Sequence, residues 1–445
     1  MREMKDSGVI WIGEIPSSWK VSKLKYLFGE GDDGLKIGPF GSAMKGKTLE
    51  NGPYKIYNQA HLISNDFSLD RHFVSEETFE ELKNYEVKPG DVLFSMMGTI
   101  GKCQIMPFGY PKGIMDSHLL KAGLKNTILP KFLLYAYDKD NSPQAISQLL
   151  YASNGTIMNG LNSSILKSVI IALPPVEEQQ KIIKYLDAKC SKIDAIIAKQ
   201  GQIIEKLKEN RLAIITEAVT VGLNPEVDKK NSGIEWVSEI PVHWGKIKLK
   251  YASYIRARLG WKGLKADEYV EEGYPLLSAF NIVNSKIDFE NNINYINQER
   301  YDESPEIMLS KGDILLVKDG AGIGKCGIVE ELPMASTTNG SLAVITTNER
   351  LVPKYLYYYF LSAIFQQYID RIKDGMGVPH LFQSDLKEIE VVVPNKYEQN
   401  RIVEFLDQKV SIIDEKIEKI ARMNEKMQEY KKSLIYEVVT GKKEV

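Results

Sequence analysis

The stretch with the clearest potential for chemistry is a glycine-rich loop, DGAGIGKCG, at residues 319–327. Glycines beside a lysine bind phosphate in the Gly-x-x-x-x-Gly-Lys-[Ser/Thr] loop of nucleotide hydrolases. When Gly324 is the second glycine of that pattern, Asp319 occupies the place of the first. Cys326 occupies the place of the hydroxyl that would bind magnesium. The flanking runs DILLV and KCGIV are strand-like, so the sequence favours a β-hairpin turn over a nucleotide site.

Other catalytic signatures are missing from the sequence. The five histidines are scattered without metal-ligand spacing, and neither a His-Glu-x-x-His nor a Gly-x-Ser-x-Gly motif occurs. Cys103, Cys190 and Cys326 are odd in number and far apart, which is typical of a reduced protein without disulfides or a zinc site. The sequence therefore predicts no catalytic residues, no metal and no cofactor.

Composition places the chain among soluble globular proteins. Its 445 residues suffice for more than one domain, and 43% of them are hydrophobic. The net charge of −2 argues against a strongly basic nucleic-acid binder, although local basic patches can still bind phosphate. The first residues lack the apolar core of a signal peptide, and no run approaches the ~20 apolar residues that span a bilayer. We expect a cytoplasmic protein without a membrane partner.

The sequence contains a long internal repeat. Residues 7–26 and 232–251 are identical at 11 of 20 positions, at an offset of 225. Residues 174–194 and 394–414 are identical at 10 of 21 positions, at an offset of 220. A period of this length indicates two whole modules joined head to tail rather than a solenoid.

The glycine-rich loop is part of the repeat. GDVLFSMMGTIGKC at residues 90–103 matches GDILLVKDGAGIGKC at residues 312–326. In the first copy Met96 and Cys103 stand where a phosphate loop requires glycine and a hydroxyl. Both copies fail the same test, which strengthens the interpretation as a turn.

Each module begins with about 170 residues of mixed α/β (α+β) character, because short apolar runs alternate with Gly, Pro and Asn. PKFLLYAY at residues 130–137 and PKYLYYYFLSAIFQQYIDRI at residues 353–372 are predicted helices with proline in their first turn. The tyrosines at residues 357–359 are interpreted as a core-facing helix surface; a stacking platform for nucleic-acid bases is the alternative.

Each module ends in a long helix with a heptad repeat. Nine of eleven a and d positions are apolar in both copies, and about 40 residues of helix span roughly 60 Å. A single helix cannot bury such a seam, so we expect the two helices to pair as an antiparallel coiled coil about a pseudo-twofold axis. The predicted apolar seam residues are Ile183, Leu186, Cys190, Ile193, Ile197, Ile204, Leu207, Ile214, Ala218, Val403, Leu406, Val410, Ile413, Ile417, Ile420, Met427, Leu434 and Val438.

Four polar residues interrupt the seam: Gln200, Arg211, Asn424 and Lys431. Either they lie near partly hydrated ends of the seam, or they fix the register of the two helices, as polar a residues can.

Taken in order, these motifs resemble the specificity subunit of a Type I restriction-modification system. The resemblance rests on the IPxxW and KLKY segments at residues 14–26 and 239–251, and on GPFGSAMK at residues 38–45. It also rests on the repeated GD[VI]L…G…GK segment and on LPPVEEQQKIIKYLD leading into a long helix. It covers almost the whole chain in both copies.

The resemblance implies target-recognition domains at residues 1–172 and 223–392, with conserved helical spacer regions at residues 173–222 and 393–445. Each recognition domain would read one half of a bipartite double-stranded DNA target, and the helices would set the spacer. Two modification (methyltransferase) subunits would dock on the chain and supply the S-adenosylmethionine chemistry, and restriction/translocase subunits would join for cleavage. The chain itself would be non-catalytic.

Loops with polar and basic residues are the candidates for DNA contact, because base edges are distinguishable in the major groove. In the first module the candidates are Lys36, Lys45, Lys47, Asn58, Gln59, His61, Lys102, Asn159 and Asn162. In the second module they are Arg256, Arg258, Lys262, Lys265, Asn281, Lys318, Lys325, His380 and Gln383.

Two other functions fit the sequence less well. One is a nucleotide hydrolase that uses residues 319–326, and the other is a coiled-coil scaffold that joins two protein-binding domains.

Overall fold

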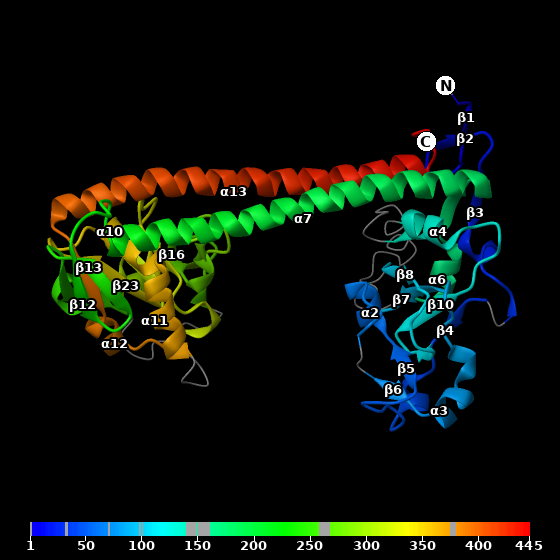
Figure 1. Ribbon diagram of the computed structural model, residues 1–445, viewed down its shortest axis with the longest axis horizontal. Coiled ribbons are helices and arrows are strands. Elements are labelled where there is room, and N and C mark those ends of the chain that lie inside the picture. Colours follow the sequence, from blue (N-terminus) through cyan, green and yellow to red (C-terminus); the bar gives the residue numbers. More distant parts are fainter. Residues whose placement is uncertain are drawn as a thin grey trace. The chain divides into compact units, whose positions relative to one another are not determined.

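The computed structural model describes residues 2–31, 34–69, 72–97, 99, 101–138, 148, 161–257, 268–373 and 380–445. The chain divides into two compact units (Figure 1). Unit 1 comprises Met1–Gln200 and Arg422–Val445, and unit 2 comprises Gly201–Ala421. Each unit contains the mixed part of one sequence module together with a part of each long helix.

Unit 1 is built from short strands and helices. Its strands are β1 (Met4–Asp6), β2 (Glu14–Pro16), β3 (Lys20–Lys23), β4 (Lys36–Ile37), β5 (Tyr54–Tyr57), β6 (Phe73–Val74), β7 (Val92–Ser95), β8 (Cys103–Ile105), β9 (Gly113–Met115), β10 (Leu119–Ala122) and β11 (Ile170–Leu173). Its short helices are η1 (Leu24–Tyr26), α1 (Gly41–Met44), α2 (Gln59–Ser64), α3 (Glu76–Glu81), η3 (Lys83–Tyr85), α4 (Pro130–Tyr137) and α6 (Ser163–Ser168).

Unit 2 has the same kind of elements. Its strands are β12 (Lys229–Ile234), β13 (Val237–Pro241), β14 (Gly245–Lys248), β15 (Ser253–Arg256), β16 (Tyr274–Leu277), β17 (Ile282–Val283), β18 (Lys286–Ile287), β19 (Asn294–Ile296), β20 (Ile314–Val317), β21 (Cys326–Ile328), β22 (Thr337–Thr338), β23 (Leu342–Thr347) and β24 (Glu390–Val393). Its short helices are α8 (Leu249–Ala252), η5 (Ala279–Asn281), α9 (Gln298–Asp302), η6 (Pro305–Ile307), η7 (Gly320–Gly322), α10 (Pro353–Leu361), α11 (Ala363–Lys373) and α12 (Gln383–Glu388).

The two units share one sheet topology. The four-stranded sheet β4-β10-β7-β8 of unit 1 corresponds to β15-β23-β20-β21 of unit 2, and the three-stranded sheet β6-β5-β9 corresponds to β19-β16-β22. In both three-stranded sheets the last pair is parallel, β5 with β9 and β16 with β22. The pairs β1-β2 and β11-β3 correspond to β12-β13 and β14-β24. The sequence repeat is therefore a repeat of structure, and the mixed α+β class predicted for each module is confirmed.

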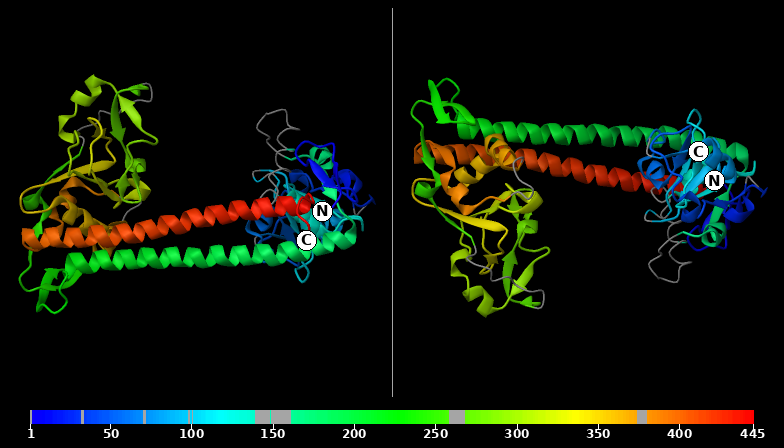
Figure 2. Two further views of the ribbon diagram at one scale, coloured as in Figure 1. Left: turned by 90° about the horizontal axis from the view of Figure 1, so that it is seen from above. Right: turned by 90° about the horizontal axis from the view of Figure 1, so that it is seen from below.

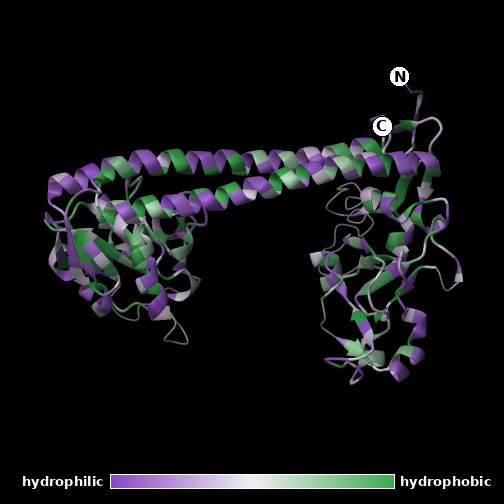
Figure 3. Ribbon diagram, viewed as in Figure 1, coloured by the Kyte–Doolittle hydropathy of each residue, from purple (hydrophilic) through white to green (hydrophobic). Residues whose placement is uncertain are grey.

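The long helices are α7 (Val176–Thr220) and α13 (Lys396–Val439), which lie side by side in both views of Figure 2. Every predicted a and d position of both helices is buried or half-buried. Figure 3 shows hydrophobic and hydrophilic residues alternating along the two helices, whereas many strands of the sheets are hydrophobic. The heptad prediction is confirmed, because only a seam with that period keeps one face of each helix covered.

Two ion pairs establish that the helices are antiparallel. Within unit 1, Lys431 Nζ lies 2.8 Å from Asp194 Oδ2. Within unit 2, Arg211 Nε lies 2.9 Å from Asp414 Oδ1. In unit 1, Leu186 and Leu434 share a core, so going back along α7 from Asp194 corresponds to going forward along α13 from Lys431. In unit 2, Ala218 and Leu406 share a core, so going forward from Arg211 corresponds to going back from Asp414. α7 and α13 are thus antiparallel within each unit.

The polar seam residues lie inside the seam. Gln200 and Asn424, both in unit 1, are half-buried, and Gln200 Oε1 and Asn424 Oδ1 are buried without a hydrogen-bond partner among the described residues. Arg211 and Lys431 instead reach carboxylates of the other helix. Buried amide oxygens are not expected at a hydrated seam end, so this arrangement favours a role in register.

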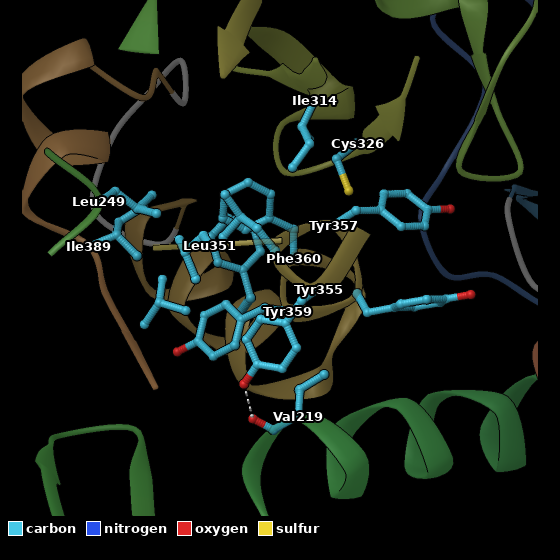
Figure 4. Packing of buried hydrophobic residues seen from close by; sticks show 14 of the residues in the cluster. Val219, Leu249, Ile314, Cys326, Leu351, Tyr355, Tyr357, Tyr359, Phe360 and Ile389 are labelled. Carbon is cyan, nitrogen blue, oxygen red and sulfur yellow. Dashed lines mark hydrogen bonds between the residues drawn. The ribbon is translucent and has the colours of Figure 1, made fainter. Parts of the chain in front are cut away.

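Each mixed part has its own core, and the tyrosines of α10 belong to that of unit 2 (Figure 4). Tyr357, Tyr358 and Tyr359 are 7%, 3% and 0% exposed. Tyr355 is fully buried as well, and its hydroxyl donates to the Val219 carbonyl of α7 at 3.3 Å. The interpretation of this run as a core-facing helix surface is confirmed, and the stacking platform is wrong because the rings are covered.

The start of each long helix is tied to its unit by the same two side chains. In unit 1 the Trp19 indole donates to Glu178 at 2.7 Å, and Leu129 N donates to Gln179 Oε1 at 2.8 Å. In unit 2 the Trp244 indole donates to Glu398 at 3.0 Å. Gln399 there accepts from Val352 N at 2.8 Å. None of the described helices combines the length and apolar character needed to cross a membrane.

Candidate nucleic-acid interface

The glycine-rich loop forms a hairpin between β20 and β21. Val317 N donates to the Lys325 carbonyl at 2.8 Å, and Gly324 N donates to the Val317 carbonyl at 2.9 Å. Gly324 has a φ of +87°, and a Cβ there would lie 2.8 Å from Ile369 Cγ2 of α11. The hairpin prediction is confirmed. Because a strand rather than a helix follows the loop, the phosphate-loop interpretation is wrong.

In unit 2 this hairpin is one of four segments that backbone hydrogen bonds join into an edge. Asn339 N donates to the Leu277 carbonyl at 2.8 Å, at the end of β16. Lys318 N donates to the Ser341 carbonyl, and Leu381 N donates to the Lys318 carbonyl, both at 2.9 Å. The four segments are residues 277–281, 339–341, 318–319 and 380–382.

Unit 1 has the same edge. Asp116 N donates to the Tyr57 carbonyl at 2.9 Å, at the end of β5. Met96 N donates to the His118 carbonyl at 2.9 Å, and Leu161 N donates to the Met96 carbonyl at 2.6 Å. Here the four segments are residues 57–61, 116–118, 96–97 and 161–162. We call this arrangement the four-segment edge in both units.

The backbone of the four-segment edge is shared, but its side chains differ. In unit 1, Met97, His118 and Asn162 are exposed and Gln59 is half-buried. In unit 2, Phe280 and Phe382 are exposed, whereas Asp319 and His380 are half-buried and pair with each other. Phe280 is 87% exposed and Phe382 is 50% exposed. The Phe382 ring packs edge to face against His380, with ring centroids 4.4 Å apart, so Phe280 is the more open of the two.

Two sequence candidates on the edge, His61 and Asn281, hold helix starts instead. His61 is fully buried, and its Nδ1 accepts from Asn58 N at 3.1 Å at the start of α2. Asn281 is 2% exposed and its Oδ1 accepts from Ser278 N at 2.9 Å, which is the same capping arrangement. Because neither side chain reaches the surface, the DNA contacts predicted for them are wrong in this structure. Asn58 caps α2 by accepting from Ala60 N at 3.0 Å.

Three cationic candidates are largely buried in ion pairs. The Arg256 guanidinium lies 2.7 Å from the fully buried Asp313 carboxylate and is 14% exposed. Lys102 lies 3.8 Å from Asp138 and is 13% exposed. Lys318 lies 3.0 Å from Asp319, which also pairs with His380. Their charges are thus partly compensated within the fold.

One hollow of about 400 Å³ in unit 2 brings two candidates together with further lysines. Arg256 and Gln383 line it beside Lys250, Lys387 and Tyr254. Gln383 is the first residue of α12 and directly follows the last segment of the four-segment edge. The hollow therefore adjoins that edge.

The remaining candidates lie elsewhere. Lys36 is on β4, Lys45 ends α1 in an exposed position, and Lys47 pairs with Glu81 at 2.6 Å. Lys325 is exposed and directly precedes β21. Asn159, Arg258, Lys262 and Lys265 lie outside the described residues.

Sequence reasoning missed Met97, Phe280, Asp319 and Phe382 because it searched for basic and amide side chains. A signal was present in the repeat. When Asn58-Gln-Ala-His61 is aligned with Ser278-Ala-Phe-Asn281, the capping residues coincide and an exposed phenylalanine stands out. Within the described part of the chain, no group of three or more His, Cys, Asp and Glu side chains could hold a metal ion.

A family model, the Type I restriction modification DNA specificity domain, matches residues 16–209 and 260–422. The chain belongs to this family. As a member of the DNA specificity domain family, it has relatives in archaea and bacteria. The MjaX relative of Methanocaldococcus jannaschii, a putative type I restriction enzyme specificity subunit, is 27% identical over 97% of this chain and 95% of its own.

Two further relatives have the same description. The type I restriction enzyme MjaVIII specificity subunit of that archaeon is 27% identical over 74% of both chains. The EcoBI specificity subunit of Escherichia coli is 26% identical over 63% of this chain and 61% of its own. The family model, which matches a stretch of each module, places both repeats in the specificity-domain family.

The fold also matches a solved structure. A chain from a study of complex assembly and conformational transition of the type I R-M system superposes with a TM-score of 0.69 at 15% identity. The match covers 96% of this chain and 98% of that chain. The match shows that the two chains share a fold.

Proposed function

We propose that the chain is the non-catalytic DNA-recognition subunit of a Type I restriction-modification complex, and that each unit reads one half of a bipartite duplex target. The observation that carries this proposal is the four-segment edge. One hydrogen-bonded backbone frame occurs in both units, while the exposed side chains on it differ. Two different half-sites require this combination of equal scaffolds and unequal surfaces.

The side chains on the two edges suit contact with bases. Amide and imidazole groups such as those of Gln59 and His118 can hydrogen-bond base edges in the major groove, where all four base pairs are distinguishable. Phe280 and Phe382 can contact a thymine methyl group or wedge between bases. Lysines around the edge would position the phosphates without reading sequence.

We assign the long helices two tasks: setting the spacer between the half-sites, and docking two methyltransferase subunits. Besides the buried seam, apolar residues are exposed one heptad apart on each helix. They are Ile196, Ile203, Met423 and Tyr430, between 43% and 56% exposed. A second apolar stripe of this kind suits a partner helix. The docked subunits would carry the methyl-transfer chemistry, and restriction/translocase subunits would join them.

Mapping of methylated bases tests the proposal. The chain is expressed with its modification subunits, and the methylated motif is compared between wild type, a unit 1 variant (Gln59→Ala with His118→Ala) and a unit 2 variant (Phe280→Ala with Phe382→Ala). Each variant should relax or change bases in one half of the motif and leave the other half and the spacer unchanged.

A matched control removes two exposed side chains of the long helices, Lys199→Ala with Lys206→Ala, and should leave the motif unchanged. If both edge variants methylate the wild-type motif with wild-type selectivity, the four-segment edge does not read DNA. Capture of unrelated proteins by each unit, with no DNA preference in the assembled complex, would instead support the scaffold function.

A further inference from the structure

Most residues that are identical in the two modules have a role inside the fold, but one exposed set does not. The repeated tryptophan and glutamate bond to each other, and the repeated glutamine binds the segment before α4 or α10. The repeated Lys-Leu-Lys-Tyr at residues 23–26 and 248–251 is different, because its lysines and tyrosine lie mainly at the surface.

The two copies of this segment are held identically. In unit 1, Leu24 is fully buried and its N–H donates to the Val169 carbonyl at 2.8 Å, just after α6. In unit 2, Leu249 is fully buried and its N–H donates to the Ile389 carbonyl at 2.9 Å, just after α12. The buried leucine fixes the flanking lysines and tyrosine beside the short helix.

That short helix contributes one more repeated lysine. Lys167 of α6 and Lys387 of α12 occupy equivalent positions, and both are exposed. We define the Lys-Tyr patch as Lys23, Lys25, Tyr26 and Lys167 in unit 1, and Lys248, Lys250, Tyr251 and Lys387 in unit 2.

The aromatic residue of the patch is open in both units. Tyr26 is 61% exposed and Tyr251 is 58% exposed. A lysine covers each ring, because Lys25 Nζ lies 4.6 Å from the Tyr26 centroid and Lys250 Nζ lies 5.2 Å from that of Tyr251. A feature that the duplication has kept on the surface of both units points to a ligand common to both.

We infer that the Lys-Tyr patch of each unit binds the phosphodiester backbone of duplex DNA independently of sequence. The inference rests on the proposed function. Contacts to phosphate position a protein on DNA without carrying sequence information, so they are the contacts that two modules with different half-sites can share. Lysine is depleted in protein–protein interfaces, which favours phosphate over a protein partner as the ligand of a three-lysine patch.

In unit 2, the hollow lies between the Lys-Tyr patch and the four-segment edge. Lys250 and Lys387 of the patch line it together with Gln383, which directly follows the four-segment edge. A phosphate bound in this hollow would be close to the bases that the edge contacts.

The two patches differ in charge. In unit 2, Glu388 lies 2.7 Å from Lys248 and 2.6 Å from Lys250, so one carboxylate compensates both lysines. Ser168 occupies the place of Glu388 in unit 1. Within the described residues, Lys23 and Lys25 have no ion-pair partner. The patch of unit 1 should therefore supply more of the salt-dependent affinity.

Salt-dependent DNA binding tests the inference. The full chain, assembled with its modification subunits, is titrated with several duplexes of unrelated random sequence at a series of salt concentrations. Lys25→Ala with Lys167→Ala should weaken binding to all duplexes alike and lower the slope of log K against log salt by about 1.8. Glu388→Ser should strengthen binding and steepen the slope, because it frees two lysines in unit 2.

The matched control removes two other exposed lysines, Lys112→Ala with Lys311→Ala. They precede β9 and β20, at the opposite ends of these strands from the four-segment edge, and should leave the slope unchanged. Thermal unfolding checks that each variant is folded.

An unchanged slope in the intact Lys25/Lys167 variant overturns the inference. So does lost capture of the modification subunits with unchanged DNA binding, which would make the patch a protein-docking surface. In both cases the wild-type complex still methylates its motif, whereas failure of the proposed function would leave the wild-type complex itself without a motif.

Discussion

At the scale of single residues, some cationic and amide side chains of the loops are proposed to contact DNA, and others stabilise the fold. Arg256 is one that stabilises the fold. Its guanidinium donates to Asp313, whose side chain is fully buried, and to Thr346 Oγ1 at 2.6 Å. No pattern in the sequence separates such an arginine from one that faces DNA, because its partners, Asp313 before β20 and Thr346 of β23, lie 57 and 90 residues away.

Arg256→Ala should therefore destabilise unit 2 rather than act only on DNA binding. Removing one partner of a buried ion pair leaves the Asp313 carboxylate uncompensated, at a cost of about 3 kcal/mol in the free energy of unfolding. Chemical denaturation of the full chain measures this loss. The exposed Lys325→Ala should change the free energy by no more than about 0.5 kcal/mol. A loss of less than about 1 kcal/mol for Arg256→Ala would contradict the structural role.

Glu388 provides a test by pH. Hydrogen bonds from Lys248 and then Lys250 lower the pKa of Glu388 from an ordinary value of 4.5 to about 2. A carboxylate with a lowered folded-state pKa contributes stability that is complete above the unfolded value and is lost as pH falls through the folded value. The difference in free energy of unfolding between wild type and Glu388→Gln should stay constant from about pH 7 to 5 and shrink only between about pH 4.5 and 2.

Urea unfolding at a series of pH values measures that difference. If it already shrinks between about pH 7 and 5, Glu388 is not held ionised by the two lysines.

At the scale of elements, the spacing of apolar residues along the sequence was sufficient to predict the long helices, but not to predict the four-segment edge. Counting heptads predicted the seam positions of α7 and α13, because a coiled-coil seam depends only on spacing along one helix. It did not mark buried residues outside the seam such as Ile182 and Ile402, which pack into the cores of the units. Proline at the first turn likewise predicted α4 and the start of α10. The single helix expected over residues 353–372 is instead divided at Ser362 into α10 and α11. The four-segment edge could not be predicted in this way, because its hydrogen bonds join segments such as 96–97 and 161–162 that are distant in sequence.

The seam offers a prediction of its own. Asn424→Ile removes a buried amide oxygen that has no hydrogen-bond partner among the described residues, so stability should rise by about 1–2 kcal/mol. Asn424→Ile should also allow α7 and α13 to pair in more than one register, because a polar residue at an a position disfavours pairings that are shifted along the helix. Denaturant unfolding measures the stability. Disulfide trapping of Asp194→Cys with Lys431→Cys measures the register, and its yield should fall in the Asn424→Ile background. Asn424→Gln is the control that keeps the amide.

At the scale of the whole molecule, duplication separates what is common from what is specific. The shared topology, the ion pair of the seam and the Lys-Tyr patch occur once in each unit, whereas the side chains on each edge occur in one unit only. The bases read by each unit could not be predicted from sequence. Comparing the two copies of the repeat identifies the shared backbone, but it does not say which bases the differing side chains contact.

Exchange of one module should therefore change one half-site only. When residues 1–172 are replaced by the equivalent part of another family member, the methylated motif should keep the half-site of unit 2 and acquire a new first half-site. Methylation mapping in a host that carries the modification subunits measures both halves. An unchanged first half-site in a well-folded hybrid would show that this part of the chain does not determine it.

The composition of unit 1 also has a consequence for synthesis on the ribosome. Leu434, Ile435, Val438 and Val439 of α13 are buried in the same core as Trp19 and Leu24. Unit 2, by contrast, is one continuous stretch, Gly201–Ala421. Since a core cannot close before its residues exist, the unit begun first should be completed last, and its open apolar surface needs protection while the second unit is translated.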